Sequence, residues 1–111
     1  MDTAIRVLLY DVLNSIVEIE SFIEKDLTFE HFQADVKTKR AVERNLEIIG
    51  EAVNRIIKID PGFQITSSKK IISLRNRIIH GYDSISDELI WSVLIQHLPV
   101  LEEEVRTFLN E

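Results

Sequence analysis

The stretch Leu74–Asp83 reads Leu-Arg-Asn-Arg-Ile-Ile-His-Gly-Tyr-Asp and ends a pattern of apolar residues at helical spacing. At about 100° per residue, one arc of this predicted helix carries five aliphatic side chains, Ile71, Ile72, Leu74, Ile78 and Ile79. Arg75 falls near the middle of that arc. Because an unpaired buried charge costs several kcal/mol, Arg75 needs a carboxylate partner, a subunit interface or an anionic ligand.

Apolar residues recur at helical spacing on both sides of this stretch, and capping residues mark the helix ends. The predicted elements are a helix from a Thr3 cap to about Lys25, a capped single turn at Thr28–Phe32, a helix from an Asp35 cap to about Lys58, a helix over about 68–80 that Gly81 stops, and a helix from a Ser86 cap to the end. Pro99 should kink or split the last helix, because it lacks a backbone donor and clashes with the previous turn. The sequence therefore predicts an all-α fold, an antiparallel four-helix bundle plus a short helix, as one domain over residues 1–111.

The composition is that of an ordinary globular domain, with 45% hydrophobic and 29% charged residues. No apolar run approaches the roughly 20 residues of a membrane span, and no signal peptide is visible. The chain has no cysteine, which excludes disulfides and thiolate metal sites. We therefore expect no membrane partner and a cytoplasmic location.

The net charge of −6 is unevenly distributed along the chain. Residues 61–82 contain Lys69, Lys70, Arg75 and Arg77 and no acidic residue, whereas residues 83–111 contain seven acidic residues and one basic residue. The negative total argues against a protein that coats nucleic acid generally. The net-positive segment makes Lys69, Lys70 and Arg77 candidate phosphate contacts around Arg75, and the alternative is a chance distribution beside a solvated acidic face.

The second long helix contains residues that bear on Arg75. Glu47 and Glu51 lie one turn apart and become partners for Arg75 if the second and third helices pack face to face. The alternative is that both glutamates belong to a solvated charged face. Gly50 costs roughly 1 kcal/mol relative to alanine inside a helix, which suggests that another helix or subunit approaches closely there.

Arg75 and His80 together have the chemistry of phosphodiester cleavage. A histidine can take a proton from a ribose 2′-hydroxyl or give one to a leaving 5′-oxygen, and an arginine can hold the scissile phosphate. Asn76 could orient either group, and the reaction needs neither a metal nor a cofactor. Five residues on one helix place Arg75 and His80 about 140° apart. A symmetric dimer in which two copies of this helix meet near their C-terminal ends would bring both groups into one cleft.

The segment Arg75–Tyr82 resembles the Arg-x4-His-x-Tyr signature of HepT-like toxins in the HEPN superfamily. The stretch Arg44–Ala52 and the pair Leu98–Pro99 are also similar to that family. The resemblance implies an all-helical homodimer that acts as a metal-independent RNase, with Arg75 and His80 catalytic and Asn76 supporting them. It also implies a type VII-like toxin–antitoxin system, in which an MntA-like nucleotidyltransferase antitoxin transfers AMP to the motif tyrosine, here Tyr82.

Two other functions remain open at this point. The chain could be a non-catalytic helical module that binds nucleotide, or that positions substrate for a minimal nucleotidyltransferase. It could also be a structural helical dimer in which Arg75 forms only a buried ion pair. The intact pair of Arg75 and His80 distinguishes the RNase, because binding alone would not require both residues.

Overall fold

The computed structural model describes residues 1–81 and 85–110. Its helices are α1 (Thr3–Phe22), α2 (Phe29–Ala34), α3 (Val36–Ile59), α4 (Ser68–Ile79), α5 (Asp87–Ser92), the π-helical segment η1 (Val93–His97) and α6 (Leu98–Leu109). The described ranges contain no strand, which confirms the predicted all-α class. In the same ranges, none of the helices combines the length and hydropathy needed to cross a bilayer.

Most helices begin at the capping residue that the sequence predicts. The side chains of Thr28, Asp35 and Ser86 each accept a hydrogen bond from a backbone N–H in the first turn of the helix that follows, at 3.0–3.2 Å. An acceptor at this position satisfies a donor that has no partner inside the helix, so the sequence specifies where α2, α3 and α5 start. Gly81 has a φ of 63°, the left-handed conformation that favours glycine, and confirms the predicted end of α4.

The predicted limits of the first helix are wrong at both ends. Asp2 rather than Thr3 is the cap, because its carboxylate accepts from the N–H groups of Ala4 and Ile5 at 2.7 and 3.3 Å. A carboxylate also interacts favourably with the positive end of the helix dipole. The helix ends at Phe22, because Ile23 adopts an extended backbone and packs against the core.

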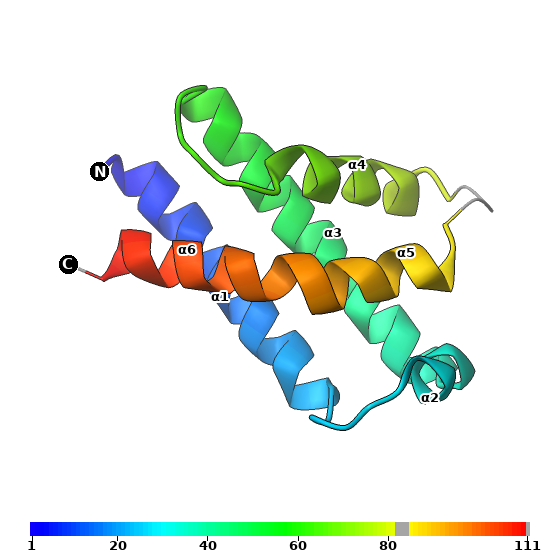
Figure 1. Cartoon of the computed structure of the whole chain (residues 1–111). Helices are drawn as coiled ribbons and strands as arrows, with labels where there is room; N and C mark the ends of the chain where they lie inside the picture. Colours follow the sequence, from blue (N-terminus) through cyan, green and yellow to red (C-terminus); the bar gives the residue numbers. More distant parts are fainter. Residues whose placement is uncertain (82–84, 111) are drawn as a thin grey trace.

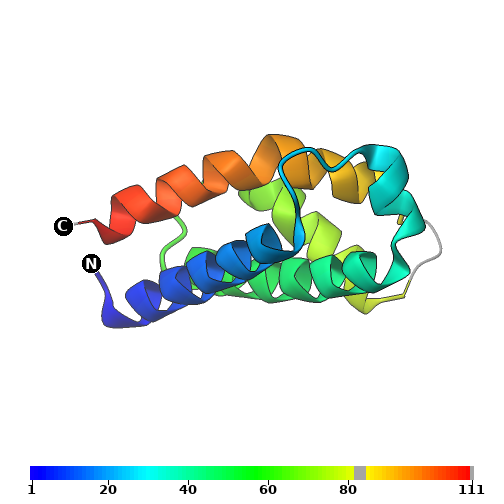
Figure 2. The same ribbon diagram turned by 90° about the horizontal axis from the view of Figure 1, so that it is seen from below.

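The helices form two layers around one apolar core. Helices α1 and α3 lie side by side, and the rod formed by α5, η1 and α6 covers them (Figures 1 and 2). Helix α4 packs against α3, and Ser67 at its start hydrogen bonds to His97 of the rod, with Oγ and Nδ1 2.9 Å apart. The largest side chains of the core that are fully buried include Phe32, Leu9, Ile16, Leu46, Ile49, Ile56 and Leu101.

Pro99 splits the last helix as predicted. It stands in the first turn of α6, directly after η1, and the N–H of Leu98 donates to the carbonyl of Val93, five residues earlier. In a regular α-helix the proline ring would clash with the carbonyl of the residue four positions before it. The wider π-helical turn avoids this clash, and α5 and α6 continue as one rod (Figure 1).

Gly50 marks the place where α4 crosses α3 most closely. A Cβ added at Gly50 would overlap the Cβ of Arg75, and would lie 2.8 Å from the Cγ of Arg75 and 3.3 Å from the carbonyl oxygen of Ile71. The close approach expected from the sequence is therefore confirmed. The missing side chain at position 50 sets the position of Arg75 over α3.

Replacing Gly50 with alanine is expected to destabilise the protein. In an unobstructed helix this change stabilises by about 1 kcal/mol, but overpacking typically costs about 1–3 kcal/mol. We expect the overlap with Arg75 to dominate, so that the Tm in a thermal melt falls by several degrees. The matched control is Gly62→Ala, because a Cβ at Gly62 would meet its nearest neighbour at 3.5 Å. A Gly50→Ala variant as stable as the parent would contradict this account of the helix crossing.

Candidate functional site

The buried side of α4 is rotated relative to the arc that the sequence predicts. Ile71 and Leu74 are each 2% exposed, whereas Ile79, predicted on the same arc, is 41% exposed. The buried arc is therefore centred between Ile71 and Leu74, about 70° from Arg75. Arg75 lies at the edge of the arc rather than in its middle, because the side of α4 that faces the core is the one with Ile71 and Leu74, while Cβ and Cγ of Arg75 pack over Gly50 of α3.

Arg75 is held by two side chains. Its Nη2 forms an ion pair with Oε2 of Glu51, and its Nη1 donates to Oδ1 of Asn76 at 2.9 Å. The side chain of Arg75 is only 21% exposed, and its Nε is buried without a hydrogen-bond partner. Glu51 thus supplies the carboxylate that the position of Arg75 requires.

Of the two glutamates predicted as partners of Arg75, only Glu51 forms that contact. Glu47 pairs with Arg44 on the same helix, with Oε2 and Nη1 3.3 Å apart. Glu51 also accepts a hydrogen bond from Nε of Arg55 at 3.0 Å, so its carboxylate joins two guanidinium groups. The pairing follows from the crossing of α4 over α3 at Gly50, one residue before Glu51.

These residues line an open groove of about 390 Å³ between α1, α3 and α4. The lining residues are Leu8, Asp11, Arg44, Glu47, Ile48, Glu51, Ala52, Arg55 and Arg75. The groove therefore carries three guanidinium groups and three carboxylates. Sequence reasoning did not identify Arg55 as part of the site, although its spacing from Glu51 and Arg44 places all three on one stripe of a helix.

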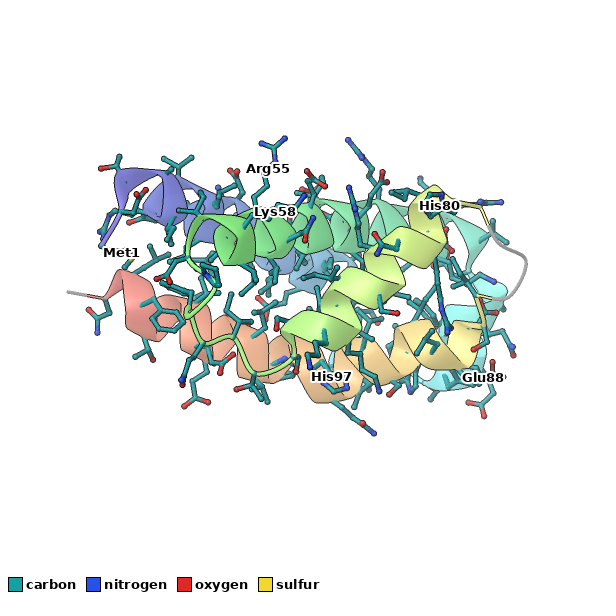
Figure 3. The ribbon with its side chains drawn as sticks, turned by 90° about the horizontal axis from the view of Figure 1, so that it is seen from above. Met1, Arg55, Lys58, His80, Glu88 and His97 are labelled. Carbon is teal, nitrogen blue, oxygen red and sulfur yellow. The ribbon has the colours of Figure 1, made fainter. Side chains whose placement is uncertain are left out.

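His80 follows the last residue of α4, and its side chain is exposed. Its backbone N–H donates to the carbonyl of Asn76 at 3.2 Å, and Figure 3 shows it at the C-terminal end of α4. His80 does not line the groove, and its five-residue separation from Arg75 corresponds to about 140° around a helix. A single chain thus places Arg75 in the groove and His80 outside it.

The other basic residues singled out in the sequence also lie outside the groove. Lys69, Lys70 and Arg77 are exposed on α4, and none of them lines it. Tyr82 lies outside the described residues. Within the described part of the chain, no group of three or more histidine, aspartate or glutamate side chains has the geometry to hold a metal ion.

Comparisons with known proteins identify the family of this chain. The family described as Ribonuclease HepT-like matches residues 12–108. A protein of Methanocaldococcus jannaschii named "Putative RNase MJ0127" is 36% identical over 96% of this chain and 88% of its own length. "Probable ribonuclease HepT" of Thermococcus cleftensis is 32% identical over 85% of this chain and 86% of its own length. No solved structure gives a significant match. The match over residues 12–108, together with these relatives, shows that the chain belongs to the HepT-like ribonuclease family.

Proposed function

We propose that this protein is a metal-independent endoribonuclease and the toxin of a type VII-like toxin–antitoxin system. The observation that carries the proposal is the guanidinium of Arg75, fixed by Glu51 and Asn76 in the wall of an open groove, on the helix that His80 directly follows. Family membership supports the activity, because the relatives above are named as RNases. RNA is therefore the proposed substrate.

The proposed reaction uses the two residues in different roles. His80 accepts the proton of a ribose 2′-hydroxyl, whose oxygen attacks the adjacent phosphorus. The bond from phosphorus to the 5′-oxygen breaks, that oxygen takes up a proton, and a 2′,3′-cyclic phosphate forms. Arg75 binds the phosphate and stabilises the charge that develops on its oxygens, while Asn76 holds the guanidinium in place. The step needs neither a metal nor a cofactor.

We place the complete site between two copies of the chain. One copy presents Arg75 in the groove and His80 on another side of α4, so a phosphate bound to Arg75 is reached best by His80 of a second copy. The exposed side chain of Ile79, next to His80, supports a contact at this end of α4, because burial of an isoleucine there would stabilise an interface.

We further propose that an MntA-like nucleotidyltransferase controls the protein by transferring AMP to Tyr82. Tyr82 is two residues from His80, close enough for an attached group to affect the site. The added phosphate would compete with RNA for Arg75, Arg77, Lys69 and Lys70, and the base would block access to the site. The family resemblance of the motif supports this assignment.

One experiment tests activity and control together. The purified chain is expected to cleave single-stranded RNA in EDTA and to leave 2′,3′-cyclic phosphate ends. After incubation with ATP and the nucleotidyltransferase, the parent should gain AMP by intact-mass spectrometry and lose cleavage, whereas Tyr82→Phe should remain unmodified and active. Cleavage that requires a divalent metal would refute the proposed chemistry. Equal AMP addition to parent and variant would show that another residue is modified.

A further inference from the structure

Helix α3 contributes a regular row of charged side chains to the lining of the groove. Arg44, Glu47, Glu51 and Arg55 are separated by three, four and four residues, and all four line the groove. At 1.5 Å per residue, Arg44 and Arg55 lie about 16 Å apart along the helix axis. Arg75 reaches the row at Glu51, between these two arginines.

The two outer arginines remain accessible while they are paired. Arg44 and Arg55 have side chains that are 67% and 64% exposed, although each contacts a glutamate of the row. Figure 3 shows Arg55 projecting away from the bundle. A guanidinium carries five donors in a fixed fork, so contact with one carboxylate leaves donors for an anion.

We propose that Arg44 and Arg55 bind the phosphates on either side of the one held by Arg75, so that α3 forms a track for the backbone of single-stranded RNA. The inference rests on the proposed function and names the contacts that would orient the strand. The backbone positions of Arg44 and Arg55 span about 16 Å of the α3 axis, and Arg75 reaches the row between them, so each of the three side chains can turn to a different phosphate of an extended strand.

The carboxylates of the row fit this role. Glu47 and Glu51 hold the three arginines in position before RNA arrives, which limits the side-chain entropy lost on binding. Three arginines and three carboxylates balance in the groove, so its net charge does not attract RNA. Recognition depends instead on the placement of the hydrogen-bond donors. Loss of one arginine from the groove should therefore weaken RNA binding more than loss of an arginine elsewhere on the surface.

Lys69, Lys70 and Arg77 are weaker candidates for this track. They lie about 120–160° from Arg75 around α4 and do not line the groove. The matched control is Arg106, which is 55% exposed and pairs with Glu102 four residues earlier, as Arg55 pairs with Glu51. Arg106 lies on α6 and does not line this groove.

The test measures binding of a fluorescent 2′-O-methyl RNA oligonucleotide, which lacks the reactive hydroxyl, at several salt concentrations. Arg44→Gln and Arg55→Gln should each raise the Kd about fivefold or more and lower the slope of log Kd against log salt by about 0.7. Arg106→Gln removes the same charge and should bind like the parent. Circular dichroism should show equal helix content in all variants.

The outcomes separate this inference from the proposed function. If Arg75→Ala binds the oligonucleotide as tightly as the parent, RNA does not use the groove and the proposed function fails with the track. If Arg75→Ala loses binding while Arg44→Gln and Arg55→Gln bind like Arg106→Gln, the track alone is overturned. An equal loss in all three glutamine variants would also overturn it, because net charge would then explain the effect.

Discussion

Replacing His80 with alanine is expected to slow RNA cleavage by a factor of about 10²–10⁴, the range that a positioned general acid or base contributes. The fold should be unaffected, because the His80 side chain is exposed and α4 ends through the backbone of His80 and the left-handed Gly81. Substitutions at exposed positions usually change stability by less than about 0.5 kcal/mol. The measurement is the initial rate on labelled RNA in EDTA, with circular dichroism and a thermal melt as folding checks.

The matched control for this variant is His31→Ala. His31 is also exposed, and it lies on α2, where its Nδ1 is 3.1 Å from the hydroxyl of Thr28. Loss of this histidine should leave the cleavage rate unchanged. If His80→Ala cleaves as fast as His31→Ala, then His80 is not the acid or base and the proposed mechanism is wrong.

The fold was largely predictable because its signals are local. Apolar spacing and the capping residues Thr28, Asp35 and Ser86 specify where helices form, and the geometry of proline specifies a break near Pro99. The error at the first helix has the same origin, because Asp2 and Thr3 are both capping residues and only the backbone geometry distinguishes them.

The candidate site was less predictable because it depends on how helices are rotated against one another. Periodicity predicts an apolar arc on α4 but not which part of it faces the core. Arg75 and Ile79 were therefore both predicted to be more buried than they are. Gly50 indicated a close approach, and Glu51 was one of two candidate partners. The role of Arg55 in the groove was missed because an arginine paired four residues from a glutamate has the same sequence pattern as any solvated helix face.

Replacing Arg75 with alanine is expected to reduce cleavage about 10²–10³-fold, since removal of one group that stabilises transition-state charge has effects of that size. The cost in stability should be small, about 1 kcal/mol or less, because Glu51 keeps Arg55 as a partner and the pair is partly exposed to solvent. Arg75→Lys should recover only part of the rate, because lysine keeps the charge but lacks the planar fork. Rates and Tm values measured on the same preparations provide the comparison.

Glu51→Gln separates a catalytic Arg75 from a purely structural one. If Arg75 served only in the ion pair with Glu51, replacing either partner would lower the Tm by a similar amount, and neither replacement would change the cleavage rate. Under the proposed function, Glu51→Gln leaves the guanidinium of Arg75 in place with only its contact to Asn76, so this variant should cleave more slowly than the parent but much faster than Arg75→Ala. Equal cleavage by the two variants would favour the structural role.

Mixing the Arg75→Ala and His80→Ala chains tests whether the two residues act across a dimer. Each variant alone should cleave at least about 10²-fold more slowly than the parent, but a mixed dimer has one site with an intact Arg75 from one chain and an intact His80 from the other. Random association makes half of the dimers mixed, with one of two sites intact, so about a quarter of the parental activity should return. Sedimentation should give at least twice the chain mass of 12.9 kDa. Differently tagged chains would show whether mixed dimers form. If mixed dimers form but the mixture stays inactive, Arg75 and His80 do not act together across the interface, and the proposed site shared between two chains is wrong.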